Sequence, residues 1–305
     1  MDLANVPDLA GEGKDMAVIT RLPWWAKLAA KLVLARLPVP YGLWRRLGLF
    51  RHGKMNVPVR ALKAFDTYYQ RAISHVNLSP GFCSLELGPG DSVLSGLAAR
   101  AYGAKRVWLV DAGVYAETDV EACRRMAALL EQVGRLLPDL SGARTLAEVI
   151  EYAGIDYLSN GVASLAAIPD CSIDFFWSQV VLEHVAREEF VDLLRELRRV
   201  VTPNSVGVHG IDFRDHLGGG LSNMRFSSGI WETYFFRNSG FYTNRIRPSE
   251  MLAMFVDAGF DVDLVGQTRW PTMPIPRGQL AREFQALSDE DLMVAEIEII
   301  VRPRS

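Results

Sequence analysis

Cysteine is scarce in this sequence, and its three thiols are scattered. Cys83, Cys123 and Cys171 form no CxxC pair and are odd in number, which argues against a disulfide framework and against a zinc knuckle. Three reduced thiols in a reducing compartment account for them. Internal repeats and low-complexity segments are also absent, and the 49% hydrophobic and 23% charged residues are ordinary for a soluble globular protein.

Long apolar runs are missing as well. No window holds 18 uncharged apolar residues, so a transmembrane helix is not supported. The N-terminus, MDLANVPDLAGEGKD, is polar and acidic and lacks the basic-then-apolar order of a secretory signal. We therefore expect a cytoplasmic protein. Its 305 residues fit one large domain with an accessory segment, or two small domains.

One stretch of the chain contains no acidic residue. Between Met16 and Ala64 there are ten Lys or Arg residues and no Asp or Glu, whereas the remainder has 23 basic and 36 acidic residues. Such an asymmetry predicts that the N-terminal segment, residues 1–80, contacts something anionic or packs on the acidic body of its own chain.

Residues 24–37 in this segment are predicted to form a helix between two prolines. At 1.5 Å per residue it would be ~21 Å long, too short for the ~30 Å hydrocarbon core of a bilayer. It could lie on a membrane surface as a peripheral contact. Trp24 and Trp25 would then be at the interface, with Lys27 and Lys31 towards the head groups. Packing on the catalytic body is the interpretation that we favour.

From about residue 81 onwards, short apolar runs alternate with helical patterns. Strands are predicted near residues 83–88, 106–111, 155–159, 206–212, 260–267 and 291–303, and residues 172–185 open as a strand and pass into a loop or helix. Helices are predicted near residues 57–76, 93–103, 116–137, 145–154, 188–200 and 247–259. The alternation predicts an α/β fold for residues 81–305: a doubly wound, mostly parallel seven-stranded sheet with an antiparallel final hairpin.

The strongest local signal is the run Glu86-Leu-Gly88-Pro89-Gly90-Asp91-Ser92, at the junction of the first predicted strand and its helix. Glycines there let a ligand approach the backbone, and the helix N-terminus offers unpaired N–H groups. Asp111 ends the second strand, 21 residues after Gly90, where ribose hydroxyls would bind. A purely structural glycine turn is the competing interpretation. The dinucleotide fingerprint GxGxxG is incomplete because residue 93 is valine.

Three segments in this order resemble the class I S-adenosylmethionine-dependent methyltransferases. LELGPGDS with LVDAG is similar to their first motif and the acidic strand end, PDCSIDFFWSQVVLEHV to their fourth-strand segment, and RPSEMLAMFVDAGFDV to their late helix and sixth strand. The similarity covers roughly residues 82–302.

The resemblance implies a role for each matching residue. Glu86, Gly88 and Gly90 would hold the methionine part of S-adenosylmethionine, and Asp111 would bind the ribose. Ala112 and Gly113 would flank the adenosine. Ser178 and Gln179 would line the floor of the cofactor site near the sulfonium. The sequence departs from the family pattern twice. Ser92 replaces the third motif glycine, and Ser164 stands where an acidic residue usually contacts adenine.

A hydroxyl acceptor needs a base, because its proton must leave as the methyl group arrives. His184 follows the fourth strand, at the sheet edge where ligands bind. A second cluster, His209, Asp212, Asp215 and His216, follows the fifth strand and could supply a base with an orienting partner. These residues could also bind a divalent metal or form a solvated rim; we do not favour a metal.

A long aromatic-rich insertion near residues 214–247 is predicted to form a lid over the acceptor. Aromatic faces suit sugars and other flat or apolar acceptors. A helical pair with its own small core is an equally compatible interpretation.

The sequence thus predicts an S-adenosylmethionine-dependent enzyme that methylates an oxygen of a small molecule or glycan. Three alternatives remain open: a non-catalytic cofactor-binding regulatory module, a nicotinamide-dependent oxidoreductase, and a nucleic-acid methyltransferase. Val93 argues against the oxidoreductase, and the acidic body argues against nucleic acid. The acceptor and the oligomeric state are not fixed by the sequence.

Overall fold

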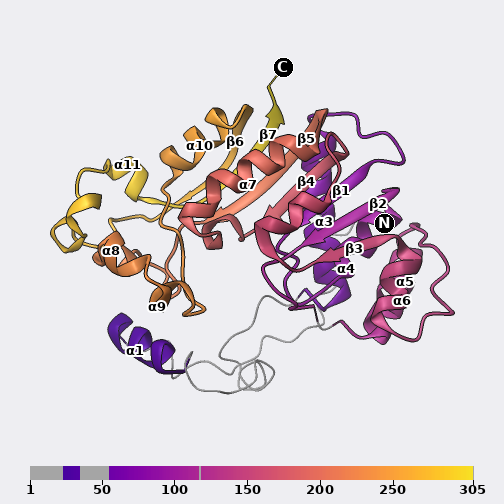
Figure 1. Ribbon diagram of the computed structural model, residues 1–305, viewed down its shortest axis with the longest axis horizontal. Helices are drawn as coiled ribbons and strands as arrows, with labels where there is room; N and C mark the ends of the chain where they lie inside the picture. Colours follow the sequence, from indigo (N-terminus) through magenta and orange to yellow (C-terminus); the bar gives the residue numbers. More distant parts are fainter. Residues whose placement is uncertain (1–22, 35–54, 117, 305) are drawn as a thin grey trace.

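A single seven-stranded sheet organises the protein (Figure 1). The computed structural model describes residues 23–34, 55–116 and 118–304. The strand order is β3-β2-β1-β4-β5-β7-β6. The strands are β1 Cys83–Leu87, β2 Arg106–Val110, β3 Ile155–Leu158, β4 Ile173–Gln179, β5 Val201–Asp212, β6 Phe260–Arg269 and β7 Val294–Pro303. Strands β1 to β5 pair in parallel, and β7 runs antiparallel to both β5 and β6, which confirms the predicted fold class.

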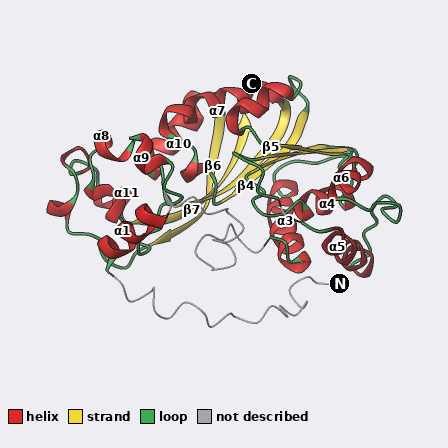
Figure 2. Ribbon diagram, turned by 60° about the horizontal axis from the view of Figure 1, so that its bottom comes forward, coloured by secondary structure: helices red, strands yellow, loops and turns green. Residues whose placement is uncertain are grey.

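Helices cover both faces of the sheet (Figure 2). One face carries α3 Pro58–Ile73, α4 Leu94–Ala101, α5 Val120–Gln132 and α6 Leu146–Ala153. The other carries α7 Arg187–Val200 and α10 Pro248–Asp257. Every residue of β1 is therefore buried, as expected for a central parallel strand whose apolar run does not alternate.

Local signals set the helix boundaries. Thr145 and Glu148 form a capping box at the start of α6, and Gly154 ends that helix at a φ of 64°. Helix α5 is shorter than the predicted range 116–137, because the Asp119 side chain caps its N-terminus by accepting a hydrogen bond from the Ala122 N–H. Gly134, at a φ of 76°, follows its C-terminus.

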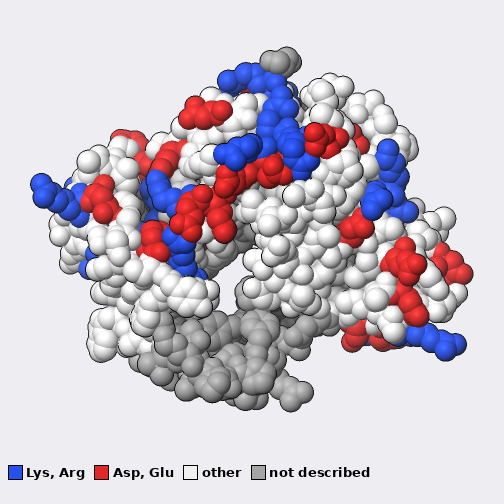
Figure 3. Space-filling model, in the orientation of Figure 1, with Lys and Arg blue, Asp and Glu red and all other residues white. Residues whose placement is uncertain are grey.

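Helix α7 has an apolar inner face and a charged outer face (Figure 3). Phe190 and Leu197 are buried against the sheet. Along the helix, Arg195 pairs with Asp192 and Arg199 pairs with Glu196. Such exposed pairs contribute little stability, so the burial of the apolar face holds the helix in place.

A second lobe lies beside the β5–β7–β6 side of the sheet (Figure 1). It combines the predicted insertion with residues 270–293, the connection between β6 and β7, and we call residues 217–246 and 270–293 the insertion lobe. Its elements are η5 Ser222–Arg225, α8 Ser228–Trp231, α9 Tyr234–Arg237, η6 Arg277–Gln279, η7 Arg282–Phe284 and α11 Asp289–Leu292. Leu221 and Met224 pack with Ile275 and Leu292, so the lobe has a core of its own.

Helix α1, Trp24–Leu34, packs on the insertion lobe rather than on the sheet. Leu28 is buried beside Trp231 and Phe236. The Trp24 ring meets Phe226 edge-on, with ring centroids 6.2 Å apart. The apolar stripe that a membrane would need is thus used within the chain. The predicted end of this helix, residues 35–37, lies outside the described residues, and no helix in the described part of the chain is long and apolar enough to span a bilayer.

Candidate active site

The candidate site lies at the carboxyl ends of β1, β2, β4 and β5. These strands are parallel, so their carboxyl ends share one edge of the sheet. The chain turns to β2 on one side of β1, and β4 lies on the other side. Ligands of doubly wound sheets bind in the crevice at such a switch point.

The glycine loop after β1 is held close to its neighbours. Gly88 has a φ of 67° and Gly90 a φ of 68°, in the left-handed region that favours glycine. The Gly88 N–H donates to the Val110 carbonyl, at 2.8 Å. A Cβ atom on Gly88 would lie 2.4 Å from a methyl carbon of Val181, so a larger residue would collide with the segment after β4.

Asp111 ties this loop to the end of β2. Its two carboxylate oxygens accept hydrogen bonds from the Gly90 N–H, at 2.9 Å, and from the Ala112 N–H, at 2.7 Å. An ionised carboxylate has about four acceptor sites, and these bonds use one on each oxygen. Asp111 therefore shapes the loop in addition to any contact with a ribose, which stays a prediction.

Glu86 is a buried carboxyl on β1. It accepts a hydrogen bond from the Ser95 hydroxyl at 2.5 Å, and burial raises its pKa to about 8, with the nearby Asp111 charge adding to the effect. In the folded protein without a cationic partner, Glu86 is therefore largely protonated near neutral pH.

The rest of the predicted cofactor set lies around this loop. Pro89 is buried and Asp91 half-buried. The Ser92 hydroxyl accepts hydrogen bonds from the Leu94 N–H, at 3.1 Å, and from the Thr118 hydroxyl, at 3.3 Å, so it caps the start of α4. Gly113 lies against Tyr115, and a Cβ atom there would be 2.9 Å from the Tyr115 ring.

Ser164 has a local bonding partner. It lies in η3, Gly161–Ala167, and its hydroxyl accepts a hydrogen bond from the Asn160 N–H at 2.9 Å. The Gly161 N–H in turn donates to the Asp111 carbonyl, at 2.8 Å, which keeps this segment beside the end of β2. An adenine contact through Ser164 stays a prediction.

Ser178 and His209 do not face the carboxyl edge, contrary to the sequence prediction. They are direct neighbours in the register of β4 and β5, both are fully buried, and the Ser178 hydroxyl lies 2.8 Å from Nδ1 of His209. Burial lowers the pKa of His209 to about 3, so the ring is neutral in the core between Phe176 and Phe255. The structure therefore separates them from the cofactor floor and from the base cluster.

Gln179 is exposed at the end of β4, and it remains the predicted floor residue. The next residue, Val180, has a φ of 57°. A β-branched residue is strained there by roughly 1–3 kcal/mol, and such strain often accompanies functional sites. Sequence reasoning did not find this turn.

Asp215 fills its acceptor capacity with backbone N–H groups, so the prediction that it acts as a base is not supported. One oxygen accepts from the N–H groups of Leu217, Gly218 and Gly219 at 2.8–3.1 Å, and the other accepts from the Ser222 N–H. Asp215 is only 3% exposed. Its carboxylate holds the loop that leads from β5 into the insertion lobe.

We expect Asp215→Ala to lower the free energy of unfolding by about 3 kcal/mol, because buried N–H groups that lose an acceptor cost about 1–3 kcal/mol each and some of them will find water. Chemical denaturation followed by circular dichroism measures this. Unchanged stability combined with a large loss of methyl transfer would restore Asp215 as a catalytic residue.

Asp212 ends β5 and pairs with Arg214. Its oxygen accepts from the Arg214 N–H at 2.8 Å and from the guanidinium at 3.4 Å, and Arg214 also pairs with Glu296 on β7. Burial raises the pKa of Asp212. Asp212 and Glu183 line the same small cavity.

His184 and His216 are brought together by the fold. His184 lies in η4, Leu182–His184, and His216 follows β5. Their rings stack with centroids 4.9 Å apart, and the two Nε2 atoms are 3.2 Å apart. Of the five predicted catalytic residues, these two form a direct pair.

Hydrogen bonding fixes the tautomers of this pair when both rings are neutral. Nδ1 of His184 lies 2.9 Å from the Tyr242 carbonyl, which can only accept, so Nδ1 carries a hydrogen. Nε2 of His184 then holds the lone pair, and Nε2 of His216 donates to it. The lone pair of neutral His216 is consequently on Nδ1.

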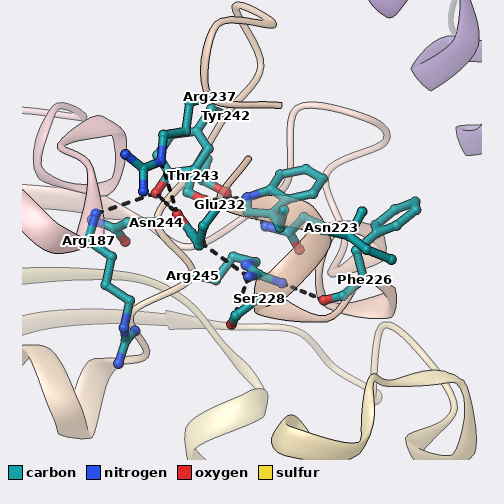
Figure 4. A network of polar contacts seen from close by, with 12 residues as sticks. Arg187, Asn223, Phe226, Ser228, Glu232, Arg237, Tyr242, Thr243, Asn244 and Arg245 are labelled. Carbon is teal, nitrogen blue, oxygen red and sulfur yellow. Dashed lines mark hydrogen bonds and ion pairs between the residues drawn. The ribbon is translucent and has the colours of Figure 1, made fainter. Parts of the chain in front are cut away.

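The insertion lobe holds η4 in place through Tyr242 and Asn244, two residues that Figure 4 labels among the polar contacts of the lobe. The Asn244 N–H donates to the Glu183 carbonyl at 2.7 Å, and its side-chain amide donates to the Leu182 and Val185 carbonyls at 2.8 and 3.0 Å. With the Tyr242 carbonyl bonded to His184, the orientation of the histidine depends directly on this lobe.

Sequence reasoning missed Glu183, the residue before His184. It is 2% exposed, and neither carboxyl oxygen has a hydrogen-bond partner among the described residues. Oε1 lies 4.0 Å from Nε2 of His184. Burial raises its pKa well above the ordinary value. The acidic residue in the LEH run was the available signal.

No group of three or more His, Cys, Asp or Glu side chains that could hold a metal ion occurs within residues 23–34, 55–116 and 118–304. Metal dependence therefore stays untested.

Comparison with known proteins gives a family for the central part of the chain. Residues 85–208, from β1 into β5, match the family model described as a methyltransferase domain. None of the curated proteins matches the chain.

Several solved structures are similar to the chain. The YcgJ protein of Bacillus subtilis is 15% identical, with 81% of this chain and 99% of that chain covered and a TM-score of 0.44. A methyltransferase of Methanosarcina mazei is 16% identical, with 76% and 97% covered and a TM-score of 0.46. Phosphoethanolamine N-methyltransferase 2 of Haemonchus contortus, in complex with S-adenosylmethionine, is 14% identical, with 80% and 53% covered and a TM-score of 0.46.

Likenesses this distant carry no argument about the acceptor. The family match covers the strands whose carboxyl ends bear the glycine loop and η4. Residues 85–208 of the chain therefore form a methyltransferase domain.

Proposed function

We propose that the protein transfers the methyl group of S-adenosylmethionine to an oxygen of a small molecule or glycan, with the His184–His216 pair as general base. The observation that carries this proposal is the 3.2 Å contact between the two Nε2 atoms, oriented by the Tyr242 carbonyl. When the acceptor hydroxyl loses its proton to this pair, the pair can share the charge, which favours proton removal near neutral pH.

The residues around the glycine loop fit the cofactor. Gly88 and Gly90 give the backbone a conformation that a ligand can approach, Asp111 offers a carboxylate beside the loop, and Glu86 lies behind it. The bound cofactor supplies an electrophilic methyl group, so the protein's main task is to align the acceptor oxygen with it.

The test is a methyl-transfer screen with radiolabelled S-adenosylmethionine against matched sets of hydroxyl, amine and thiol acceptors, including glycans. Label transferred to hydroxyl acceptors is expected. Transfer to amines or to nucleic acid alone, or no transfer by protein that binds the cofactor, would overturn the O-methylation proposal. Vesicle sedimentation in parallel tests the predicted membrane contact, for which Trp25 on α1 is 61% exposed.

The pH dependence of cofactor binding provides a separate prediction. Because the pKa of Glu86 is raised to about 8, its contribution to folding stability is complete below the unfolded pKa and is lost as the pH rises through 8. A bound cationic ammonium would favour the ionised form, so binding should release a proton. We expect the affinity for S-adenosylmethionine to rise about tenfold between pH 6 and pH 7.

Calorimetry in buffers with different ionisation enthalpies measures the released proton. Glu86→Gln is the control, and it should remove this part of the pH dependence. If the affinity changed equally with pH in the wild type and in Glu86→Gln, Glu86 would not contact the cofactor.

A further inference from the structure

A small buried cavity lies beside η4, between the sheet and the insertion lobe. Its volume is about 10 Å³, room for one water molecule or one hydroxyl group. Glu183 and Asp212 line it from the sheet side, and Asn223 and Arg245 line it from the lobe (Figure 4 shows the lobe side).

Hydrogen-bonding groups around this cavity lack partners. Both carboxyl oxygens of Glu183 and the side-chain oxygen of Asn223 are buried and accept no hydrogen bond from the described residues. Asn223 is 3% exposed, and its amide nitrogen already donates to the Thr243 hydroxyl. Leaving such groups unsatisfied costs free energy, so an occupant that donates hydrogen bonds is expected.

The charges around the cavity restrict the occupant's chemistry. Arg245 and Arg247 line the cavity, and the two residues are 6% and 2% exposed. Their terminal nitrogens already donate to other groups, such as the Phe226 and Val294 carbonyls. Their positive charge disfavours an ammonium group, and the oxygens of Glu183 and Asn223 disfavour an anion. The Nε atom of each arginine is buried without a partner among the described residues. A neutral hydroxyl satisfies both sides, because it donates to an oxygen and accepts from an N–H group.

The position of Glu183 links this cavity to the histidine pair. Its Oε1 atom is 4.0 Å from Nε2 of His184, the atom that accepts the hydrogen bond from His216. The carboxyl therefore lies beside the histidine pair. A trapped water would satisfy the cavity equally well, but it would not explain why the unpartnered carboxyl lies beside the base.

We propose that Glu183 and Asn223 form the recognition end of the acceptor site and bind one hydroxyl of a neutral acceptor that carries two adjacent hydroxyls. The second hydroxyl loses its proton to Nδ1 of His216, and its oxygen bonds to the methyl carbon as the bond between that carbon and sulfur breaks, which leaves S-adenosylhomocysteine. The first hydroxyl keeps its proton. This inference rests on the O-methylation proposed above and specifies its acceptor class.

The test uses ethylene glycol, ethanol and ethanolamine as small probes. The full-length protein is saturated with S-adenosylhomocysteine, and binding of each probe is measured by saturation-transfer NMR titration. We expect ethylene glycol to bind about tenfold more tightly than ethanol, as one additional hydrogen bond predicts, and more tightly than ethanolamine. Glu183→Leu should reduce the affinity for ethylene glycol to that for ethanol, and Glu183→Gln should give an intermediate value.

Glu189→Leu, at an exposed position of α7, is the matched control and should keep the preference for ethylene glycol. Ethanolamine binding as tightly as ethylene glycol, or unchanged glycol affinity in Glu183→Leu, would overturn the inference. Thermal denaturation shows that each variant is folded. Glu183→Leu should raise the melting temperature because it removes an unpartnered buried carboxyl, whereas a structural carboxyl would lower it.

Calorimetry separates this result from the proposed function. If S-adenosylhomocysteine binds and the glycol preference is absent, the acceptor class is wrong and the methyltransferase proposal stands. If the folded protein does not bind the cofactor, the proposed function fails first, and the acceptor class fails with it.

Discussion

Asp111→Asn is expected to weaken the binding of S-adenosylmethionine by about 100-fold or more. The Asp111 carboxylate accepts the Gly90 N–H with one oxygen and the Ala112 N–H with the other. An asparagine can accept only one of these, and its NH2 group then faces the other N–H. We expect the cofactor to need the loop in the conformation that these two bonds hold. Restoring it after one lost hydrogen bond to a charged group and one donor–donor contact costs about 3 kcal/mol, which corresponds to this change in Kd.

Isothermal titration calorimetry with S-adenosylmethionine and S-adenosylhomocysteine measures the effect. Asp156→Asn is the matched control, because Asp156 is on β3 and pairs with the exposed Arg106, away from the glycine loop. The control should bind like the wild type. If folded Asp111→Asn also bound like the wild type, the glycine turn would be structural, and the cofactor assignment of this loop would be wrong.

Much of the fold could be predicted from hydrophobic periodicity alone. The central strands are buried on both faces, so their sequences are continuous apolar runs, such as CSLEL in β1 and RVWLV in β2. The antiparallel end of the sheet was predictable because two strands follow the last helix with no further helix of comparable length between them. The lobe formed by residues 270–293 was missed, since it contains only short helical turns held by contacts with residues distant in sequence, such as Leu221 and Met224.

The candidate site was predicted less completely, because proximity in the sequence does not reveal the direction of a side chain. His209, Asp212, Asp215 and His216 lie within eight residues, and of these four it is His216 whose ring stacks on His184. His209 is on a strand, where side chains alternate between faces, and it points into the core. Asp215 begins a tight loop, and its carboxylate accepts hydrogen bonds from the backbone N–H groups of that loop.

Contacts with the insertion lobe explain the remaining gap. The Tyr242 carbonyl, which determines the tautomer of His184, comes from 58 residues further along the chain. Glu183 was overlooked because nothing in the sequence shows that this carboxyl is buried without a partner. Both features depend on how the lobe packs against η4, and no local pattern encodes that packing.

Replacing either histidine of the pair with alanine is expected to reduce the rate of methyl transfer by roughly 100- to 10,000-fold, the range typical of a lost general base. His184→Ala removes the ring that the Tyr242 carbonyl orients, and His216→Ala removes the partner 3.2 Å from it. Cofactor affinity should change little, because the hydrogen bonds of this pair connect the two rings with each other and with the Tyr242 carbonyl. Single-turnover transfer from radiolabelled S-adenosylmethionine, with an acceptor from the screen, gives the rate of the chemical step.

The double variant distinguishes a coupled pair from two independent residues. If the shared proton between the two Nε2 atoms makes the rings act as one base, removing both should cost little more than removing one. Independent roles would instead multiply the two rate losses.

His75→Ala is the matched control: this exposed histidine, just beyond α3, bonds to Ser74 and to the Arg71 carbonyl, so its loss should leave the rate unchanged. Near-normal rates in both single variants would leave the methyl transfer without an enzymatic base at this position, and alignment of donor and acceptor would then have to supply the catalysis.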